Sequence, residues 1–329
     1  MNRPLPQRGA ALAALALTAC AALAGPTAHA QSPAVPKQIT MVVPFPPGGS
    51  NDVFARVVAE GLGSKLNTTV VVENRPGAGG AIGSEFVARA PADGSVLMLS
   101  SSTLTTNAAV QPHLKYQVPQ SFAPVAALAD SPMAVVVAAD SPHRSLKDLL
   151  DAARKEPGKL NYGSAGLGSV NQMASEMLAG AAGVQFTHVP YKGMSPAMND
   201  LAGGRVDFVI ASFTSVSAML RGQRIRVLAV TSPKRSPFYP DLPTVAETVP
   251  DYAVQLWWGV LAPAQTPPAL LEVYNQAVRS VTSGPKLKQM FAEESAVALD
   301  YDVARFTQLV ASDARKWTVL ARERNITAQ

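Results

Sequence analysis

Short apolar runs alternate along the chain with stretches whose apolar residues recur at helical spacing. After residue 52, for example, Val53, Phe54, Val57, Val58 and Leu62 share one side of a predicted helix. The apolar runs predict strands at 39–43, 69–73, 96–99, 184–189, 205–210 and 224–230. This alternation predicts an α/β fold, with a mixed, mostly parallel sheet flanked by helices.

The length of 329 residues is too great for one ordinary core and suits two lobes, or one lobe interrupted by another. Two apolar runs, 125–129 and 134–138, flank Asp130-Ser131-Pro132, where we expect the chain to pass between lobes. The apolar run 254–261 is expected to form the strand that carries the chain back to the first lobe. We therefore predict a discontinuous first lobe and a continuous second lobe, comprising 37–130 plus 257–329 and 131–256, respectively.

Residues 1–30 have the pattern of a cleavable signal peptide. Arg3 and Arg8 precede an apolar run at 10–23, and Ala28-His29-Ala30 is a small-x-small cleavage pattern. We expect cleavage near Ala30 and a periplasmic mature protein. Alternatively, residues 17–20 form a lipobox and Cys20 becomes a lipidated first residue. Cys20 is the sole cysteine, so cleavage at Ala30 excludes disulfides, thiol nucleophiles and thiolate metal sites.

The charge of the chain argues against a nucleic-acid partner. Charged residues make up 16% of the sequence, and the formal charge of +5 includes Arg3 and Arg8 of the leader. The chain contains no run of lysines and arginines that would match a phosphate backbone.

One stretch, residues 44–52, joins the first predicted strand to the first predicted helix and is rich in proline and glycine. Two glycines, Gly48 and Gly49, allow a ligand to approach the main chain, and Ser50 or Asn51 is expected to cap the helix. The first amides of a helix have no intrahelical partner and favour a negative group. The stretch is therefore either a small carboxylate-binding platform or a plain strand-to-helix connection.

Two further glycine-rich stretches precede predicted helices. The first, 74–83, does not match the dinucleotide fingerprint, because Ile82 stands where the third glycine is needed and Pro76 interrupts the approach to the helix. The second, 163–169, ends at Ser169, which forms a predicted capping box with Gln172. This stretch lacks both the P-loop lysine and the Gly-x-Ser-x-Gly nucleophile motif, so it is either structural or ligand-binding.

Other polar groups offer weaker indications of chemistry. The hydroxyls of residues 100–103 end a predicted strand, where open α/β sheets bind ligands. Lys192 would bring positive charge to a cleft, and Asp207 would accept hydrogen bonds from a ligand or cap a neighbouring turn. The histidines after the leader, His113, His143 and His188, lack metal-ligand spacing, so we expect no metal site and no cofactor. A Ser/His/Asp triad stays open, because its members need not be close in sequence.

Taken together, the motifs resemble the Bug family, the periplasmic solute receptors of tripartite tricarboxylate transporters. The resemblance rests on motifs found in order along the chain, at 43–49 with Asp52 and Arg56, then at 74–80, 157–160, 163–166, 189–193, 228–231 and 243–245. It implies a two-lobed periplasmic-binding-protein fold of type II, the Venus flytrap. It also implies a carboxylate ligand held by main-chain amides and waters from loops 45–52 and 164–169.

Three features depart from the family pattern. Leu167 stands where a small or polar residue is frequent, Asn171-Gln172 replaces a frequent histidine-containing pair, and Ala211 stands where many members carry a second acid. These departures leave open how polar the distal end of the ligand is.

We therefore expect an extracytoplasmic solute-binding protein rather than an enzyme. We expect it to be a monomer that binds a small organic acid and delivers it to the membrane permease subunits of a tripartite tricarboxylate-type transporter. The ligand is expected to be a di- or tricarboxylate, an amino acid or an aromatic acid. Alternatives are a secreted α/β hydrolase with a cleft serine as nucleophile, and a ligand-sensing receptor for a membrane kinase. The expected ligand-binding residues are Phe45, Pro47, Gly48, Gly49, Ser50, Asp52, Ser101, Ser102, Ser164, Ala165, Gly166, Gly168, Ser169, Tyr191, Lys192 and Asp207.

Overall fold

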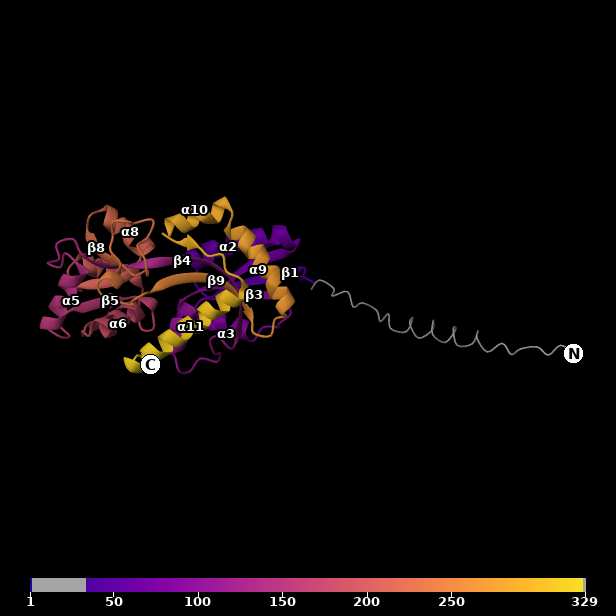
Figure 1. The fold of residues 1–329 in the computed structure, drawn as a ribbon, viewed down its shortest axis with the longest axis horizontal. Helices are drawn as coiled ribbons and strands as arrows, with labels where there is room; N and C mark the ends of the chain where they lie inside the picture. The colour runs from indigo at the N-terminus through magenta and orange to yellow at the C-terminus, as the bar shows by residue number, and fades with distance from the viewer. Residues whose placement is uncertain (2–33, 328–329) are drawn as a thin grey trace. The chain divides into compact units, whose positions relative to one another are not determined.

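A mixed sheet runs through the protein in the strand order β2-β1-β3-β9-β4-β7-β5-β6, with β10 and β8 pairing to β4 beside this path (Figure 1). The computed structural model describes Met1 and residues 34–327, and the account below concerns the unit that begins at Val35. The predicted signal peptide and Cys20 lie outside the described residues. Within the described part, no helix combines the length and the apolar character needed to span a bilayer.

The first group of strands surrounds the amino-terminal strand. β1 (Gln38–Val43) pairs in parallel with β2 (Thr69–Asn74) and β3 (Val96–Ser101), and β9 (Gln255–Pro263) runs antiparallel to β3. The carboxyl ends of β1 and β3 therefore lie at one edge of the sheet, as the sequence predicts for parallel strands.

The second group contains the middle of the chain. β5 (Asn161–Ser164) pairs in parallel with β6 (Thr187–Pro190) and β7 (Phe208–Ser212). β7 and β8 (Ile225–Val230) each run antiparallel to the end of β4.

One long strand, β4 (Phe122–Ala138), joins the two groups. Its residues up to Pro132 pair with β9, and Met133 onwards pairs with β7 and β8. The short β10 (Val297–Ala298) also pairs with it. Figure 1 shows β4 and β9 crossing between the groups. Asp130, Ser131 and Pro132 lie inside the one continuous strand β4, and the passage of the chain between lobes at these residues stays a prediction. Two strand groups joined by β4 and β9 agree with the expected two-lobed fold, and the residue boundaries of the lobes stay a prediction.

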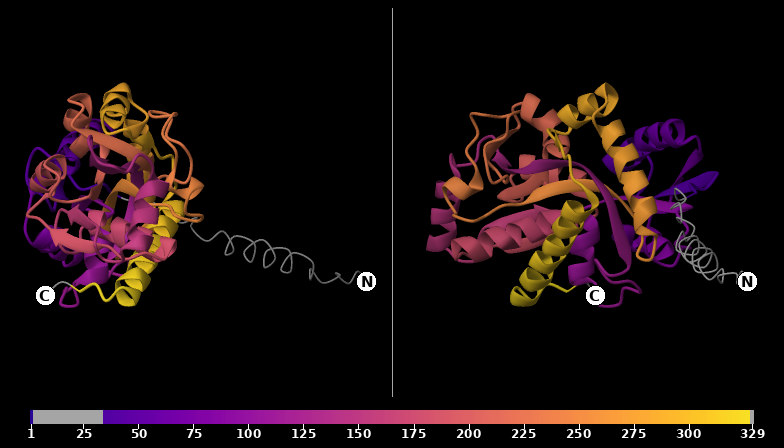
Figure 2. Two further views of the ribbon diagram at one scale, coloured as in Figure 1. Left: turned by 90° about the vertical axis from the view of Figure 1, so that its left-hand side faces the viewer. Right: turned by 45° about the vertical axis from the view of Figure 1, so that its right-hand side comes forward.

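Helices lie on both faces of the sheet (Figure 2). Their bounds are α2 (Ser50–Leu66), α3 (Ala81–Ala88), α4 (Thr103–Val110), α5 (Leu146–Lys155), α6 (Val170–Ala182), α7 (Met194–Ala202), α8 (Phe213–Arg221), α9 (Pro268–Thr282), α10 (Pro285–Glu293) and α11 (Val303–Glu323). Two short 3-10 turns, η1 (Ala78–Gly80) and η2 (Val245–Glu247), complete the described elements. α4 is an addition to the sequence prediction, which ended the strand at Ser100–Thr103 without a helix.

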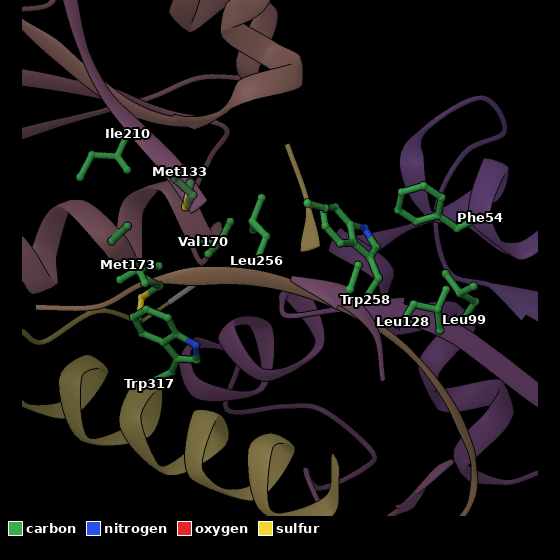
Figure 3. Packing of buried hydrophobic residues seen from close by; sticks show 14 of the residues in the cluster. Phe54, Leu99, Leu128, Met133, Val170, Met173, Ile210, Leu256, Trp258 and Trp317 are labelled. Atoms are coloured by element: carbon green, nitrogen blue, oxygen red, sulfur yellow. The ribbon is translucent and has the colours of Figure 1, made fainter. Parts of the chain in front are cut away.

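The largest hydrophobic cluster continues from one strand group into the other. Phe54 of α2 packs edge-on against Trp258 of β9, with ring centroids 5.3 Å apart. Trp317 of α11 is fully buried and points toward Met173 of α6 (Figure 3). Apolar burial of this extent stabilises the body and fixes where the loops at the strand ends can lie.

Candidate functional site

The loop between β1 and α2 is shaped mainly by its main-chain conformation. Gly48 has φ +90°, a conformation that favours glycine, and a side chain at Gly48 or Gly49 would meet no atom within 4 Å. α2 begins at Ser50 with Gly49 as its N-cap, and no side chain caps it, so the expectation of a Ser50 or Asn51 cap is wrong. Within the described part of the chain, the first-turn amides of α2 therefore have no side-chain cap as a hydrogen-bond partner.

Asp52 holds this loop in shape. Its carboxylate accepts hydrogen bonds from the Gly48 amide at 2.9 Å, from the Asn74 side-chain amide at 2.9 Å and from both Nε and a terminal nitrogen of Arg56, the latter at 2.8 Å. Burial raises the pKa of Asp52, but the hydrogen bonds from Arg56, Gly48 and Asn74 outweigh it and hold the pKa below its usual value. These bonds occupy its lone pairs, so the structure assigns Asp52 to positioning the loop. Direct contact with a ligand stays a prediction.

The second loop, between β5 and α6, is also built from glycines and hydroxyls. Gly166 and Gly168 have φ +123° and +75°. Ser169 caps α6 by accepting from the Gln172 amide at 3.4 Å, which confirms the predicted cap. The Gln172 side chain accepts instead from the Gly168 amide at 2.8 Å, so the reciprocal half of the predicted box closes one residue earlier.

Helix α4 connects this second loop to the first strand group. The Asn107 side chain donates a hydrogen bond to the Gly79 carbonyl, and a side chain at Gly168 would lie 2.4 Å from Val110 Cγ2. On the other side, a side chain at Gly80 would lie 3.3 Å from the Phe45 ring. The three glycine-rich stretches are therefore linked by close contacts. Stretch 74–83 packs against the first loop at Phe45, and α4 packs against both stretch 74–83 and the second loop at Gly168.

A cavity of about 250 Å³ opens beside the first loop. It is lined by Gly48, Gly49, Ser50, Val53, Phe54, Thr214, Met290, Glu293 and Glu294. Thr214 stands in the first turn of α8, which follows β7, so the cavity has walls from both strand groups. Residues 164–169 are not among its walls, and a cavity shared by the Gly48 and Gly166 turns stays a prediction.

Glu294 lines this cavity, and the sequence alone did not single it out. Its carboxylate accepts hydrogen bonds from the hydroxyls of Ser50 and Thr214, and the residue is 9% exposed. A signal was present in the sequence, because Glu293 and Glu294 follow one another at the carboxyl end of α10, where the helix dipole disfavours negative charge. Such a pair indicates a local role that offsets this cost.

The remaining predicted site residues differ in burial and in position. Ser101 and Ser102 are buried at the carboxyl end of β3, and the Ser102 hydroxyl has no hydrogen-bond partner among the described residues. Tyr191 packs beside the second loop, and its amide donates to the Ser164 carbonyl at 3.1 Å. Burial and a hydrogen bond to Asp200 raise the pKa of Tyr191 to about 12. Lys192 is exposed.

Asp207 lies at the opposite edge of the sheet from these loops. It precedes β7, and its carboxylate accepts from the Asn161 amide at 2.6 Å, at the amino end of β5. Since the strands are parallel, their carboxyl ends, where the loops begin, point the other way. Of the two predicted roles, the structure supports capping of the neighbouring strand, and we leave Asp207 out of the proposed site.

Ser164, the proposed nucleophile of the hydrolase alternative, is fully buried. Its hydroxyl lies within hydrogen-bond distance of His188 Nε2, at 2.6 Å, and accepts from the Gly166 amide at 3.1 Å. A buried hydroxyl engaged in this way holds the loop and is not presented to a substrate. Within the part of the chain that the structure describes, no group of His, Cys, Asp and Glu side chains is arranged to hold a metal ion.

Comparison with known proteins points to one family. Residues 54–326 match the model of the tripartite tricarboxylate transporter family receptor. The chain is 40% identical over 298 residues to the UPF0065 protein in the tcbD-tcbE intergenic region of Pseudomonas sp. strain P51, covering 89% of this chain and 88% of that protein. It is 34% identical to protein BugT of Bordetella pertussis, covering 93% of this chain and 94% of BugT.

Solved structures show the same relationship. An R. palustris protein solved with adipate has a TM-score of 0.76 and 33% identity, covering 88% of this chain and 98% of that one. MatC from Rhodopseudomonas palustris, solved with bound malate, has a TM-score of 0.73 and 28% identity, covering 86% of this chain and 98% of MatC.

Proposed function

Because the chain belongs to the tripartite tricarboxylate transporter receptor family, we propose that it captures a small organic carboxylate between its lobes and delivers it to a membrane permease of that transporter class. The observation that carries the proposal is that the uncapped start of α2, at Gly48, Gly49 and Ser50, lines a cavity with walls from both strand groups. Relatives of the same fold solved with adipate and with malate support a dicarboxylate-sized ligand.

The chemistry of the site suits binding without reaction. Helix-start amides and hydroxyls form a neutral set of donors, which stabilises a carboxylate through hydrogen bonds and through the helix dipole. We place Phe45, Gly48, Gly49 and Ser50 at the ligand, with the loop 164–169 donating from the second lobe on closure. Asp52 acts by holding the first loop.

The wider setting follows from the same premise. We propose that the protein works in the periplasm as a monomer after loss of residues 1–30, and that β4 and β9 form the crossing about which lobes 37–130 plus 257–329 and 131–256 close. A receptor for a membrane kinase would use the same closure, and neighbouring genes would distinguish the two roles.

Native mass spectrometry of freshly purified protein, followed by a thermal-shift panel of organic acids, tests the proposal. A ligand present at about a hundred times its Kd adds about 2.7 kcal/mol to the free energy of unfolding. We expect at least one di- or monocarboxylate to raise the melting temperature and to reduce the radius of gyration in small-angle scattering. Turnover of esters or amides, abolished in Ser164→Ala, would favour the hydrolase instead.

A further inference from the structure

One buried carboxylate joins the two strand groups at the cavity. Glu294 accepts from Ser50 in the first turn of α2 and from Thr214 in the first turn of α8. α2 packs on β1 and β3, whereas α8 packs on β4, β7 and β8. The Glu294 side chain therefore lies at the amino ends of two helices that belong to different groups, where the dipoles favour a negative charge.

The backbone of Glu294 is fixed from behind. Its carbonyl accepts a hydrogen bond of 2.8 Å from Ser131 Oγ, at the point where β4 crosses between the groups. Its amide donates to the Met290 carbonyl at 3.2 Å, which continues α10. The carboxylate is thus held in place by the fold and does not depend on a ligand to position it.

The cavity is consequently negative at one wall. Its lining residues include the carboxylates of Glu293 and Glu294 and no basic side chain. A ligand carboxylate on the amides near Gly48 has to share the positive end of α2 with Glu294. A second ligand carboxylate in the same small volume would meet like charge with little water to screen it.

We propose that Glu294 sets the ligand class of this receptor. It admits an acid that carries one carboxylate together with a cationic amino group facing Glu294, and it disfavours a second carboxylate there. The inference rests on the proposed function, since it assumes that the ligand binds at this cavity.

Matched probes test this charge selection in the full exported protein by isothermal titration calorimetry. Glutarate and γ-aminobutyrate differ only in the charged group at one end, as do adipate and δ-aminovalerate. We expect the unsubstituted protein to bind the amino acid of each pair about tenfold more tightly, as expected for one charge pair in a partly screened cavity. In Glu294→Gln the preference should fall about tenfold, because the neutral amide keeps the shape but loses the charge.

A neighbouring variant serves as the charge-matched comparison. Glu293→Gln removes the same charge from the same helix end, but Glu293 is exposed and water screens its charge. The preference of the Glu293→Gln protein for the amino acids should therefore differ from that of the unsubstituted protein by less than about threefold. Thr214→Val removes one hydroxyl donor and leaves the Glu294 charge, so it should retain the preference for the amino acids.

The outcomes separate the two levels of the proposal. Carboxylate binding with a preference for glutarate or adipate in the unsubstituted protein would overturn the role of Glu294, without the need for any variant. So would an unchanged preference in a folded Glu294→Gln. Failure of all the probes and of the wider acid panel to bind would contradict the proposed function and this inference together.

Discussion

Ser164 Oγ lies 2.6 Å from His188 Nε2, and the two residues stand on the neighbouring parallel strands β5 and β6. The His188 ring stacks on Tyr162, with centroids 4.8 Å apart. Burial lowers the pKa of His188, against a smaller opposing effect of Glu176. The pair therefore couples the start of the second loop to a neutral, half-buried histidine.

The pH dependence of folding should reveal this histidine. Because its pKa is lower in the folded protein than the ordinary 6.5, the unfolded chain binds more protons and stability is lost as pH falls below that value. We expect urea unfolding to show a smaller loss between pH 7 and pH 5 in His188→Gln than in the unsubstituted protein. Equal losses in both proteins would show that His188 titrates normally.

Asp130 should have the opposite effect. Burial raises its pKa to about 6, while a hydrogen bond with Gln255 partly lowers it. The folded protein therefore holds a proton that the unfolded chain releases, and stability falls as pH rises from about 4 to 6. Asp130→Asn should raise the free energy of unfolding at pH 7 by about 1–2 kcal/mol. This advantage should disappear near pH 4, and its persistence there would argue for a packing effect instead.

Asp52→Asn should loosen the first loop. The carboxylate of Asp52 accepts hydrogen bonds from Arg56 and Asn74. In the Asp52→Asn protein the new side-chain NH2 group would face one of these donors, so one hydrogen bond would be lost. We expect a loss of about 1–3 kcal/mol in denaturant unfolding, together with weaker ligand binding. Glu60→Gln on the same helix breaks an exposed pair with Lys286 and should change much less.

Gly168→Ala tests the contact between the second loop and α4. A Cβ there would lie 2.4 Å from Val110, and φ is +75°. Gly158 has the same φ with no atom within 4 Å, so Gly158→Ala measures the backbone strain alone. We expect Gly168→Ala to cost about 1–3 kcal/mol more than Gly158→Ala, and Val110→Ala to recover part of the difference in the double variant. Equal costs would place α4 away from the loop.

Gly49→Val tests whether the ligand approaches the start of α2. Gly49 has φ −85° and ψ 169°, which any residue adopts, and its missing side chain faces open space. The variant should therefore fold, with a loss of about 1 kcal/mol or less in the absence of ligand, because valine is a poorer N-cap than glycine. We expect affinity for the native acid to fall at least about tenfold, since the side chain would cover the helix-start amides. Unchanged affinity would place the ligand elsewhere.

Much of the fold could be predicted from the sequence because the relevant signals are local. Apolar runs placed β1, β2, β3 and β9, and the pattern around Ser169 placed the start of α6. The motifs at 43–49 and 163–166 indicated the family and therefore the two-lobed architecture. These features depend on spacing, capping and backbone conformation, which neighbouring residues determine.

Only the tertiary structure decided which polar groups meet. Ser50, Thr214 and Glu294 are far apart in the chain, and no periodicity brings them together. The sequence placed Asp207 among the expected ligand-binding residues, with a cap as its other role, and the parallel register then located it at the other edge of the sheet. Local sequence encodes the elements and their turns, whereas contacts between distant residues depend on how the sheet orders its strands.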